Sequence, residues 1–311
     1  MKVSLRQLQY FQSLCQHGHF GRAAAAANVS QPALSVKIKE LEETLGSALI
    51  DRTARPISPT PFGADILARS KSILTDVHDL ENAARLKRGL QGRFSLGVIP
   101  TVAPYLLPSA IAKIQSNLPD LDLHLREAQT DILLEELQNG QLDACVIATD
   151  VLNDNLRQRH LFDDRFMLAI HADQAAAMFL ADGEIALTDM APLKLLLLSE
   201  GHCLRDQAQS LCRYASQETL NQIGASSLLT LTQLAAGGYG ATLLPELAFD
   251  PSYRDENLSV LRLAEPQPDR KISLVTKRNL DRAMDVTQIA DILADAGREK
   301  TEATRACFPN L

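Results

Sequence analysis

The sequence has no tryptophan, and aromatic residues make up only 5% of its 311 positions. It contains no run of about 18 apolar residues, so no membrane-spanning helix is expected. The N-terminal segment M-K-V-S-L-R-Q-L-Q-Y lacks the apolar stretch of a secretory signal peptide. Five cysteines, an odd number, fit a reducing compartment better than a disulfide framework. Together these absences predict a cytoplasmic globular protein that does not associate with a membrane.

Motifs of enzymes are also missing. There is no G-x-G-x-x-G, no P-loop, no H-E-x-x-H and no nucleophile elbow. The seven histidines are scattered, without the paired spacing of a metal site. We therefore expect a protein that is not an enzyme and that binds no metal and no cofactor.

Charge is distributed unevenly along the chain. The whole chain carries a net charge of −7, but its first sixty residues hold seven basic side chains against four acidic ones. A basic N-terminal end on an acidic body is typical of a small DNA-reading head attached to a separate sensor.

The N-terminal residues read as three helices. Apolar side chains recur at helical spacing up to Gly18, an alanine-rich helix covers about 20–27, and a third helix follows Ser30 and ends at Gly46. Ser30 is the expected N-cap of the third helix, with Pro32 in its first turn. A helix, a tight turn and a second helix place the start of that second helix against base edges in the major groove. A three-helix packing unit without a DNA role is the alternative.

Polar and basic residues cluster where such a head would meet DNA. Ser30, Gln31, Pro32 and Ser35 occupy the start of the third helix, where a Gln side chain can read adenine. Basic residues further along would contact phosphates, which position the protein without specifying sequence; they are Lys37 and Lys39 on the helix, and Arg52 and Arg55 in a short wing.

The motif S-Q-P-A-L-S followed by I-K-E-L-E-E-T-L-G resembles the winged helix-turn-helix of LysR-type transcriptional regulators. This resemblance implies a DNA-binding domain over residues 1–60 that binds double-stranded promoter DNA. A stripe at near-heptad spacing follows within 61–89, comprising Ile66, Ile73, Val77, Leu80 and Ala84. The spacing predicts a dimerisation linker helix, and a solvated spacer helix is the alternative.

From residue 90 onward, apolar strands alternate with helical segments. Repeated β-α units predict an α/β fold with mixed, largely parallel sheets. The chain crosses twice between two halves, which predicts two Rossmann-like subdomains around a cleft, as in periplasmic binding proteins. We place subdomain I at about 90–165 and 266–300, and subdomain II at about 166–265 of an effector domain over 90–311.

The segment G-H-C-L-R-D-Q-A-Q-S-L-C begins at Gly201 and places Cys203 at the start of a helix and Cys212 near its end. A helix N-terminus with His202 and Arg205 nearby favours the thiolate, whereas Asp206 opposes it. The sequence therefore leaves open whether the pKa of the Cys203 thiol is raised or lowered. Nine helical residues rise about 13 Å, too far for a disulfide, whose Cα atoms lie within about 4.4–6.8 Å. Oxidation would have to unwind the helix. Two buried, incidental cysteines are the alternative.

Three motifs of the body resemble the OxyR group, the hydrogen-peroxide-sensing branch of the LysR family: I-P-T-V-A-P-Y-L-L-P at 99–108, E-A-Q-T at 127–130 and G-H-C-L-R-D-Q-A at 201–208. The resemblance implies that Cys203 is the peroxide-reactive thiol and Cys212 the resolving thiol. Residues that would bind peroxide or support the reaction are Thr101, Thr130, His202, Arg205 and Asp206.

The resemblance also implies partners. They are hydrogen peroxide, a homo-oligomer that is a dimer of dimers, RNA polymerase, and a thiol reductant such as glutaredoxin or thioredoxin. A LysR-type regulator that responds to a small organic inducer bound in the cleft is the first alternative. A catalytic thiol peroxidase is the second.

Overall fold

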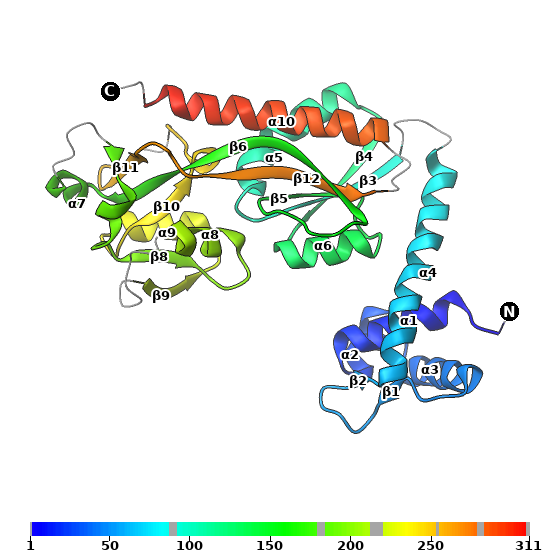
Figure 1. Cartoon of the computed structure of the whole chain (residues 1–311). Helices are drawn as coiled ribbons and strands as arrows, with labels where there is room; N and C mark the ends of the chain where they lie inside the picture. Colours follow the sequence, from blue (N-terminus) through cyan, green and yellow to red (C-terminus); the bar gives the residue numbers. More distant parts are fainter. Residues whose placement is uncertain are drawn as a thin grey trace. The chain divides into compact units, whose positions relative to one another are not determined.

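The computed structural model describes residues 2–86, 92–178, 184–211, 220–252, 255–278 and 283–308. Backbone contacts divide the chain into two units, residues 1–87 and 88–311. Helices and strands carry the labels of Figure 1.

The first unit contains three short helices and a two-stranded wing: α1 (Leu5–His17), α2 (Phe20–Ala26), α3 (Gln31–Leu45), β1 (Ile50–Asp51) and β2 (Ser58–Pro59). Ser4 and Gln7 form a capping box at the start of α1. The Ser30 side chain caps α3 as expected, and Gly46 ends that helix at a φ of 73°. Sequence signals for helix ends were therefore reliable here.

The helix α4 (Pro61–Leu86) follows the wing, and the Thr60 hydroxyl accepts a bond from Gly63 N–H at 2.9 Å. Its first turns pack on the apolar core of the first unit, to which Ile66 adds a partly buried side chain. One residue of the near-heptad stripe is therefore already packed within this unit. Further along, Ile73 and Leu80 are exposed to 45% and 71%. Dimerisation through 61–89 stays a prediction.

The second unit is a mixed α/β structure, which confirms the fold class. Its main sheet has the order β4-β3-β5-β12-β6-β11-β7, and β10 also pairs with β6. Strands β3, β4 and β5 are parallel to one another, whereas β12 and β6 are antiparallel to their neighbours. The strand bounds are β3 (Gly92–Val98), β4 (Leu121–Glu127), β5 (Ala144–Ile147), β6 (Leu156–His171), β7 (Glu184–Ile185), β10 (Thr242–Pro245), β11 (Leu258–Leu263) and β12 (Asp269–Lys277).

The long strand β6 passes through both halves of this unit. Its first part pairs with β12, and its last part pairs with β10 and β11 (Figure 1). Each half has its own apolar core, and Tyr105 packs against both. The second half also contains a parallel pair, β8 (Leu195–Leu198) and β9 (Leu220–Ala225). The predicted subdomain boundaries stay predictions.

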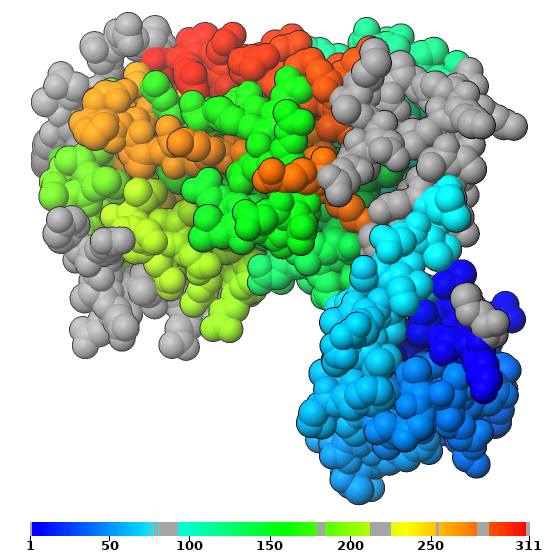
Figure 2. Space-filling view, turned by 45° about the vertical axis from the view of Figure 1, so that its right-hand side comes forward, coloured from blue at the N-terminus to red at the C-terminus, as the bar shows by residue number. Residues whose placement is uncertain are grey.

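Helices cover these sheets: α5 (Ala103–Asn117), α6 (Thr130–Gln138), α7 (Ala172–Ala177), α8 (Cys203–Leu211), α9 (Leu228–Ala236) and α10 (Ala283–Ala306), with short 3-10 turns η1 (Leu187–Met190) and η3 (Glu246–Ala248). The sequence predicts that the last helix ends near Ala296, but α10 continues to Ala306. Its extra turns bury Thr301 and Thr304, polar residues that no apolar pattern reveals. Figure 2 shows the outer face of this helix, in orange to red, along one edge of the unit. In the described part of the chain, no helix is long and apolar enough to cross a membrane.

Candidate functional site

The Cys203 pocket is a small hollow where the two halves of the second unit meet. One half contributes the turn after β3 and the start of α6, and the other contributes the turn that leads into α8. Its lining residues are Ile99, Pro100, Thr101, Gln129, Thr130, Gly201, His202 and Cys203. Ends of parallel strands and beginnings of helices are the usual ligand positions in such folds. The structure thus brings together Thr101, Thr130 and Cys203, which are distant in sequence.

The turn before α8 depends on a glycine. Gly201 has a φ of +87°, and a Cβ atom there would lie 2.4 Å from the Gln129 side-chain oxygen. Gln129 in turn donates a hydrogen bond from Nε2 to the Glu200 carbonyl at 3.2 Å. Only glycine combines this backbone conformation with so close a neighbour. The contact ties the start of α6 to the loop that presents Cys203.

Burial dominates the acidity of Cys203. It raises the pKa of the thiol, while Arg270, the Thr130 hydroxyl and the Leu204 N–H at the helix start lower the pKa, and Asp206 raises it slightly. The net shift in the pKa of Cys203, whose sign the sequence left open, is therefore upward. The thiol form is thus favoured at neutral pH. The group that stabilises negative charge on the sulfur most strongly is a side chain that sequence reasoning missed, Arg270.

The expected roles of His202 and Arg205 in favouring the thiolate are not supported. Burial lowers the pKa of His202, so its ring is neutral at pH 7 and brings no positive charge. Arg205 donates from Nη1 to the Leu198 carbonyl at 2.9 Å, which joins α8 to the end of β8, and it is not among the charges that shift the pKa of Cys203. Asp206 opposes the thiolate, as expected.

Arg270 reaches the pocket from β12. Its Nη1 donates to Thr101 Oγ1 at 2.8 Å and its Nη2 to the Thr101 carbonyl at 3.1 Å. The same guanidinium pairs with Asp164 on β6, and both of these side chains are fully buried. Thr101 is therefore held by a buried cation, and its hydroxyl proton is free to point toward a ligand.

Two polar oxygens near Cys203 make no hydrogen bond of standard geometry. They are Thr130 Oγ1, which lines the pocket, and Gln207 Oε1, one helical turn beyond Cys203. The Gln207 amide nitrogen is occupied, since it donates to the Ala148 carbonyl at 2.7 Å. Unsatisfied buried oxygens are costly and are often satisfied by water or a ligand. Sequence reasoning missed Gln207, although its position four residues after Cys203 on the same helix was available as a signal.

The size of this pocket limits what it admits. The space between its atoms, including the mouth, is about 170 Å³, against about 1830 Å³ measured in the same way for a larger cavity in the same unit. Of that larger cavity, about 810 Å³ is accessible to small molecules; it is lined by other residues, among them Leu229 and Phe249, and does not include Cys203. No group of three metal-binding side chains occurs among the residues that the structure describes.

The other cysteines lie in different environments. Burial raises the pKa of Cys145 to about 12 and that of Cys15 to about 11, so both thiols are protonated. Cys307 is exposed. Cys212, the expected resolving thiol, lies outside the described residues, and α8 ends at Leu211.

In the first unit, the start of α3 is an open polar surface. Gln31, Pro32 and the cap Ser30 are exposed and Ser35 is half-buried. Val36, which sequence reasoning missed, is 54% exposed on the same helix. An exposed apolar side chain there suits contact with a thymine methyl group.

Three of the four basic residues assigned to phosphate contact are paired with glutamates. Lys37 contacts Glu40 at 2.8 Å, Lys39 contacts Glu43 at 3.7 Å, and Arg52 contacts Glu42 at 3.0 Å. The two lysine pairs are exposed and therefore weak, so a phosphate can compete for each lysine, whereas the Glu42 partner of Arg52 is only 14% exposed. Arg55 in the wing is exposed. The DNA-reading roles stay predictions.

Residues 5–64 match the bacterial regulatory helix-turn-helix protein, lysR family, and residues 87–298 match the LysR substrate binding domain. The chain belongs to the LysR family. Among its relatives, a probable hydrogen peroxide-inducible genes activator from Streptomyces viridosporus is 40% identical over 95% of each chain.

Solved structures of similar proteins extend over nearly the whole chain of this LysR-family member. A full-length OxyR variant from Pseudomonas aeruginosa is 31% identical with a TM-score of 0.69, covering 95% of this chain and 97% of that one. A hydrogen-peroxide-bound OxyR mutant from Corynebacterium glutamicum is 32% identical with a TM-score of 0.65, covering 100% and 98%.

Proposed function

We propose that this protein is a hydrogen-peroxide-sensing, DNA-binding transcriptional regulator of oxidative-stress genes, with Cys203 as the reactive thiol. The observation that carries the proposal is the pocket itself: a thiol and two threonines line a small space, and a buried guanidinium holds one of these threonines from behind. The relatives named for hydrogen peroxide support the same ligand.

The chemistry follows from the thiol and its neighbours. The Cys203 thiolate attacks one peroxide oxygen, the O–O bond breaks, and a sulfenic acid and hydroxide form. The Thr101 hydroxyl, held by Arg270, and the unsatisfied Thr130 oxygen are placed to orient the two peroxide oxygens. Arg270 stabilises the negative charge that moves from sulfur to the leaving oxygen. The thiol must lose its proton first, which burial opposes.

The second step joins the two cysteines. The Cys212 thiol attacks the sulfenic sulfur, a disulfide forms and water leaves. Because α8 is helical from Cys203 to Leu211, the joined state requires this helix to unwind. The unwound helix changes the packing between subunits and with it the spacing of the DNA-binding heads. A dithiol reductant of the glutaredoxin or thioredoxin type then restores both thiols.

The remaining partners follow from the head and the linker. Promoter DNA in the cytoplasm binds α3 and the wing, and exposed Ile73 and Leu80 on α4 pair two copies of the chain. Two such pairs form a dimer of dimers. Contact with RNA polymerase then couples the oxidation-dependent rearrangement to transcription. The protein is a regulator rather than an enzyme, because its LysR-family helix-turn-helix converts the oxidation of the thiol into a change in DNA binding.

The alternatives give different results in solution. An organic inducer needs more room than the Cys203 pocket has, and the cavity of about 810 Å³ that Leu229 and Phe249 line offers that room. An inducer bound there would raise thermal stability regardless of Cys203. A thiol peroxidase would consume many equivalents of peroxide per minute with a reductant present.

The test is a cysteine series measured by promoter binding with and without peroxide. Cys203→Ser is expected to abolish the peroxide response and to leave DNA binding intact. Cys307→Ser, an exposed cysteine away from the pocket, is the matched control and should respond like the parent protein. A full response in Cys203→Ser would refute the proposal.

A further inference from the structure

The Arg270 side chain, which holds Thr101, is itself held by a buried carboxylate. Its Nε and Nη2 donate to Asp164 Oδ2 at 3.0 and 2.9 Å. Both side chains are inaccessible to solvent. A guanidinium has no rotational freedom left when one edge is bonded to a carboxylate and the other to Thr101.

Asp164 is fixed in turn by η3. Its second oxygen, Oδ1, accepts a bond from the Leu247 N–H at 2.9 Å. Leu247 is fully buried in the core of the half that holds Thr101. Burial raises the pKa of Asp164, with Arg270 acting in the opposite direction and Glu246 adding to the rise. The position of this short segment therefore decides how Asp164 faces Arg270.

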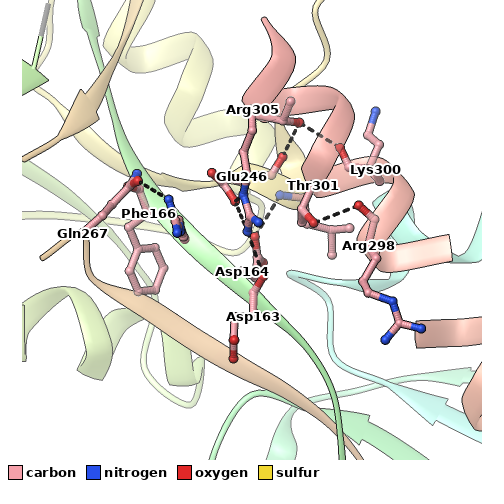
Figure 3. Close-up of polar contacts among 12 residues, drawn as sticks. Asp163, Asp164, Phe166, Glu246, Gln267, Arg298, Lys300, Thr301 and Arg305 are labelled. Atoms are coloured by element: carbon pink, nitrogen blue, oxygen red, sulfur yellow. Dashed lines mark hydrogen bonds and ion pairs between the residues drawn. The ribbon is translucent and has the colours of Figure 1, made fainter. Parts of the chain in front are cut away.

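The segment η3 is attached to the C-terminal helix by two side chains. Glu246 Oε2 accepts from Arg305 Nε at 2.9 Å and lies 2.8 Å from Arg305 Nη2. The Thr304 hydroxyl donates to the Glu246 carbonyl at 2.9 Å. Figure 3 shows Arg305 descending from the helix toward Glu246, with Asp164 beyond them on its strand.

A series of contacts thus runs from the surface to the sensing pocket. Arg305 holds Glu246, the next residue Leu247 donates its N–H to Asp164, and Asp164 pairs with Arg270, which holds Thr101. Arg305 is the accessible end, with 38% of its side chain exposed, whereas Glu246 is only 4% exposed. Breaking the Arg305–Glu246 pair leaves a buried group of η3 without its partner, so η3 shifts and moves the Leu247 N–H that holds Asp164.

We propose that Glu246 and Arg305 are positioning residues for the reaction of Cys203, acting through Asp164 to hold Arg270 against Thr101. The last turns of α10 are then part of the sensor rather than a passive cover. This inference rests on the proposed function, because it concerns the rate at which peroxide oxidises Cys203.

The experiment compares single variants of the full chain by rapid-mixing oxidation with hydrogen peroxide, read out by mass mapping of Cys203. Arg305→Gln and Glu246→Gln are the test variants. Arg298→Gln is the matched control, since Arg298 lies on the same helix, is 51% exposed and forms its own ion pair with Asp295. The parent protein is measured first, and a parent in which Cys203 does not react would refute the proposed function itself.

With a reactive parent, the two test variants should oxidise about 10- to 100-fold more slowly, the range expected when a reacting group is displaced by about 1 Å. The control should keep the parent rate. A second readout is the alkylation rate of Cys203 against pH. Its midpoint should move upward in the test variants, because Arg270 no longer lowers the pKa of the thiol.

Arg305→Lys separates positioning from mere structural support, because it keeps one positive charge beside Glu246. It should restore much of the rate and the original pH midpoint. Parent-like rates and midpoints in both Arg305→Gln and Glu246→Gln would overturn the inference, and so would equal losses in Arg298→Gln. If Glu246→Gln fails to fold, Arg305→Gln decides the question alone.

Discussion

Gly201→Ala is the substitution whose effect the structure specifies most fully. Gly201 has a left-handed φ of +87°, and the new Cβ would meet the Gln129 side-chain oxygen at 2.4 Å. An alanine in this conformation costs about 1–2 kcal/mol. Gln129 can swing away, but it then loses its hydrogen bond to the Glu200 carbonyl, worth about 0.5–1 kcal/mol at a solvated position.

The sum is about 1.5–3 kcal/mol of lost stability, which corresponds to a fall in Tm of about 3–12 °C for a unit of this size. The chemical effect is separate. Without the tie from Gln129, the loop that leads to Cys203 is no longer fixed against the other half of the unit. We expect the rate of Cys203 oxidation to fall about tenfold.

Gly238→Ala is the control for this experiment. Gly238 also has a left-handed φ, +77°, but its added Cβ would have only His171 nearby, at 3.7 Å. It should therefore lose about 1–2 kcal/mol from strain while keeping the parent oxidation rate. Scanning calorimetry gives the two Tm values, and rapid mixing with peroxide gives the two rates. Equal oxidation rates in Gly201→Ala and Gly238→Ala would show that the Gln129 contact does not place Cys203.

Four further outcomes are expected. Burial raises the pKa of Cys145 to about 12, so its thiol should resist alkylation at about pH 8 until the protein is denatured, and labelling of the native protein there would contradict the burial. The raised pKa of Cys203 means that its oxidation rate should keep increasing above the ordinary thiol pKa of about 8.5, and a plateau below about pH 8 would be the contrary result. Replacing exposed Ile73 and Leu80 by lysine should yield monomers in light scattering, with unchanged dimers counting against the linker assignment. Affinity for promoter DNA should fall steeply with salt, whereas a flat dependence would mean that the head does not dock on phosphates.

Local signals in the sequence predicted local structure well. The Ser30 cap and Gly46 stop of α3 were readable because a cap depends only on its own turn. The predicted helix start at Cys203 was likewise confirmed, since α8 begins at that residue. The resemblance to the OxyR group placed Thr101 and Cys203 in one site, and both residues line the same pocket.

Long-range polar contacts were not predictable. Arg270 lies 169 residues from Thr101 and 106 from Asp164 along the chain, and no periodicity connects such positions. Sequence reasoning therefore assigned the electrostatic role to His202 and Arg205, the nearest cationic candidates in sequence. Burial, which lowers the pKa of His202 and raises that of Cys203, depends on packing from both halves of the unit and was equally invisible.

The most direct test of the peroxide mechanism is peptide mass mapping after brief treatment with one equivalent of hydrogen peroxide. Free thiols are alkylated before digestion, so that any crosslink is preserved. The mechanism predicts a peptide pair joined through Cys203 and Cys212, with Cys15 and Cys145 fully alkylated after denaturation. A Cys203 that is recovered alkylated, with no crosslink to Cys212, would contradict it.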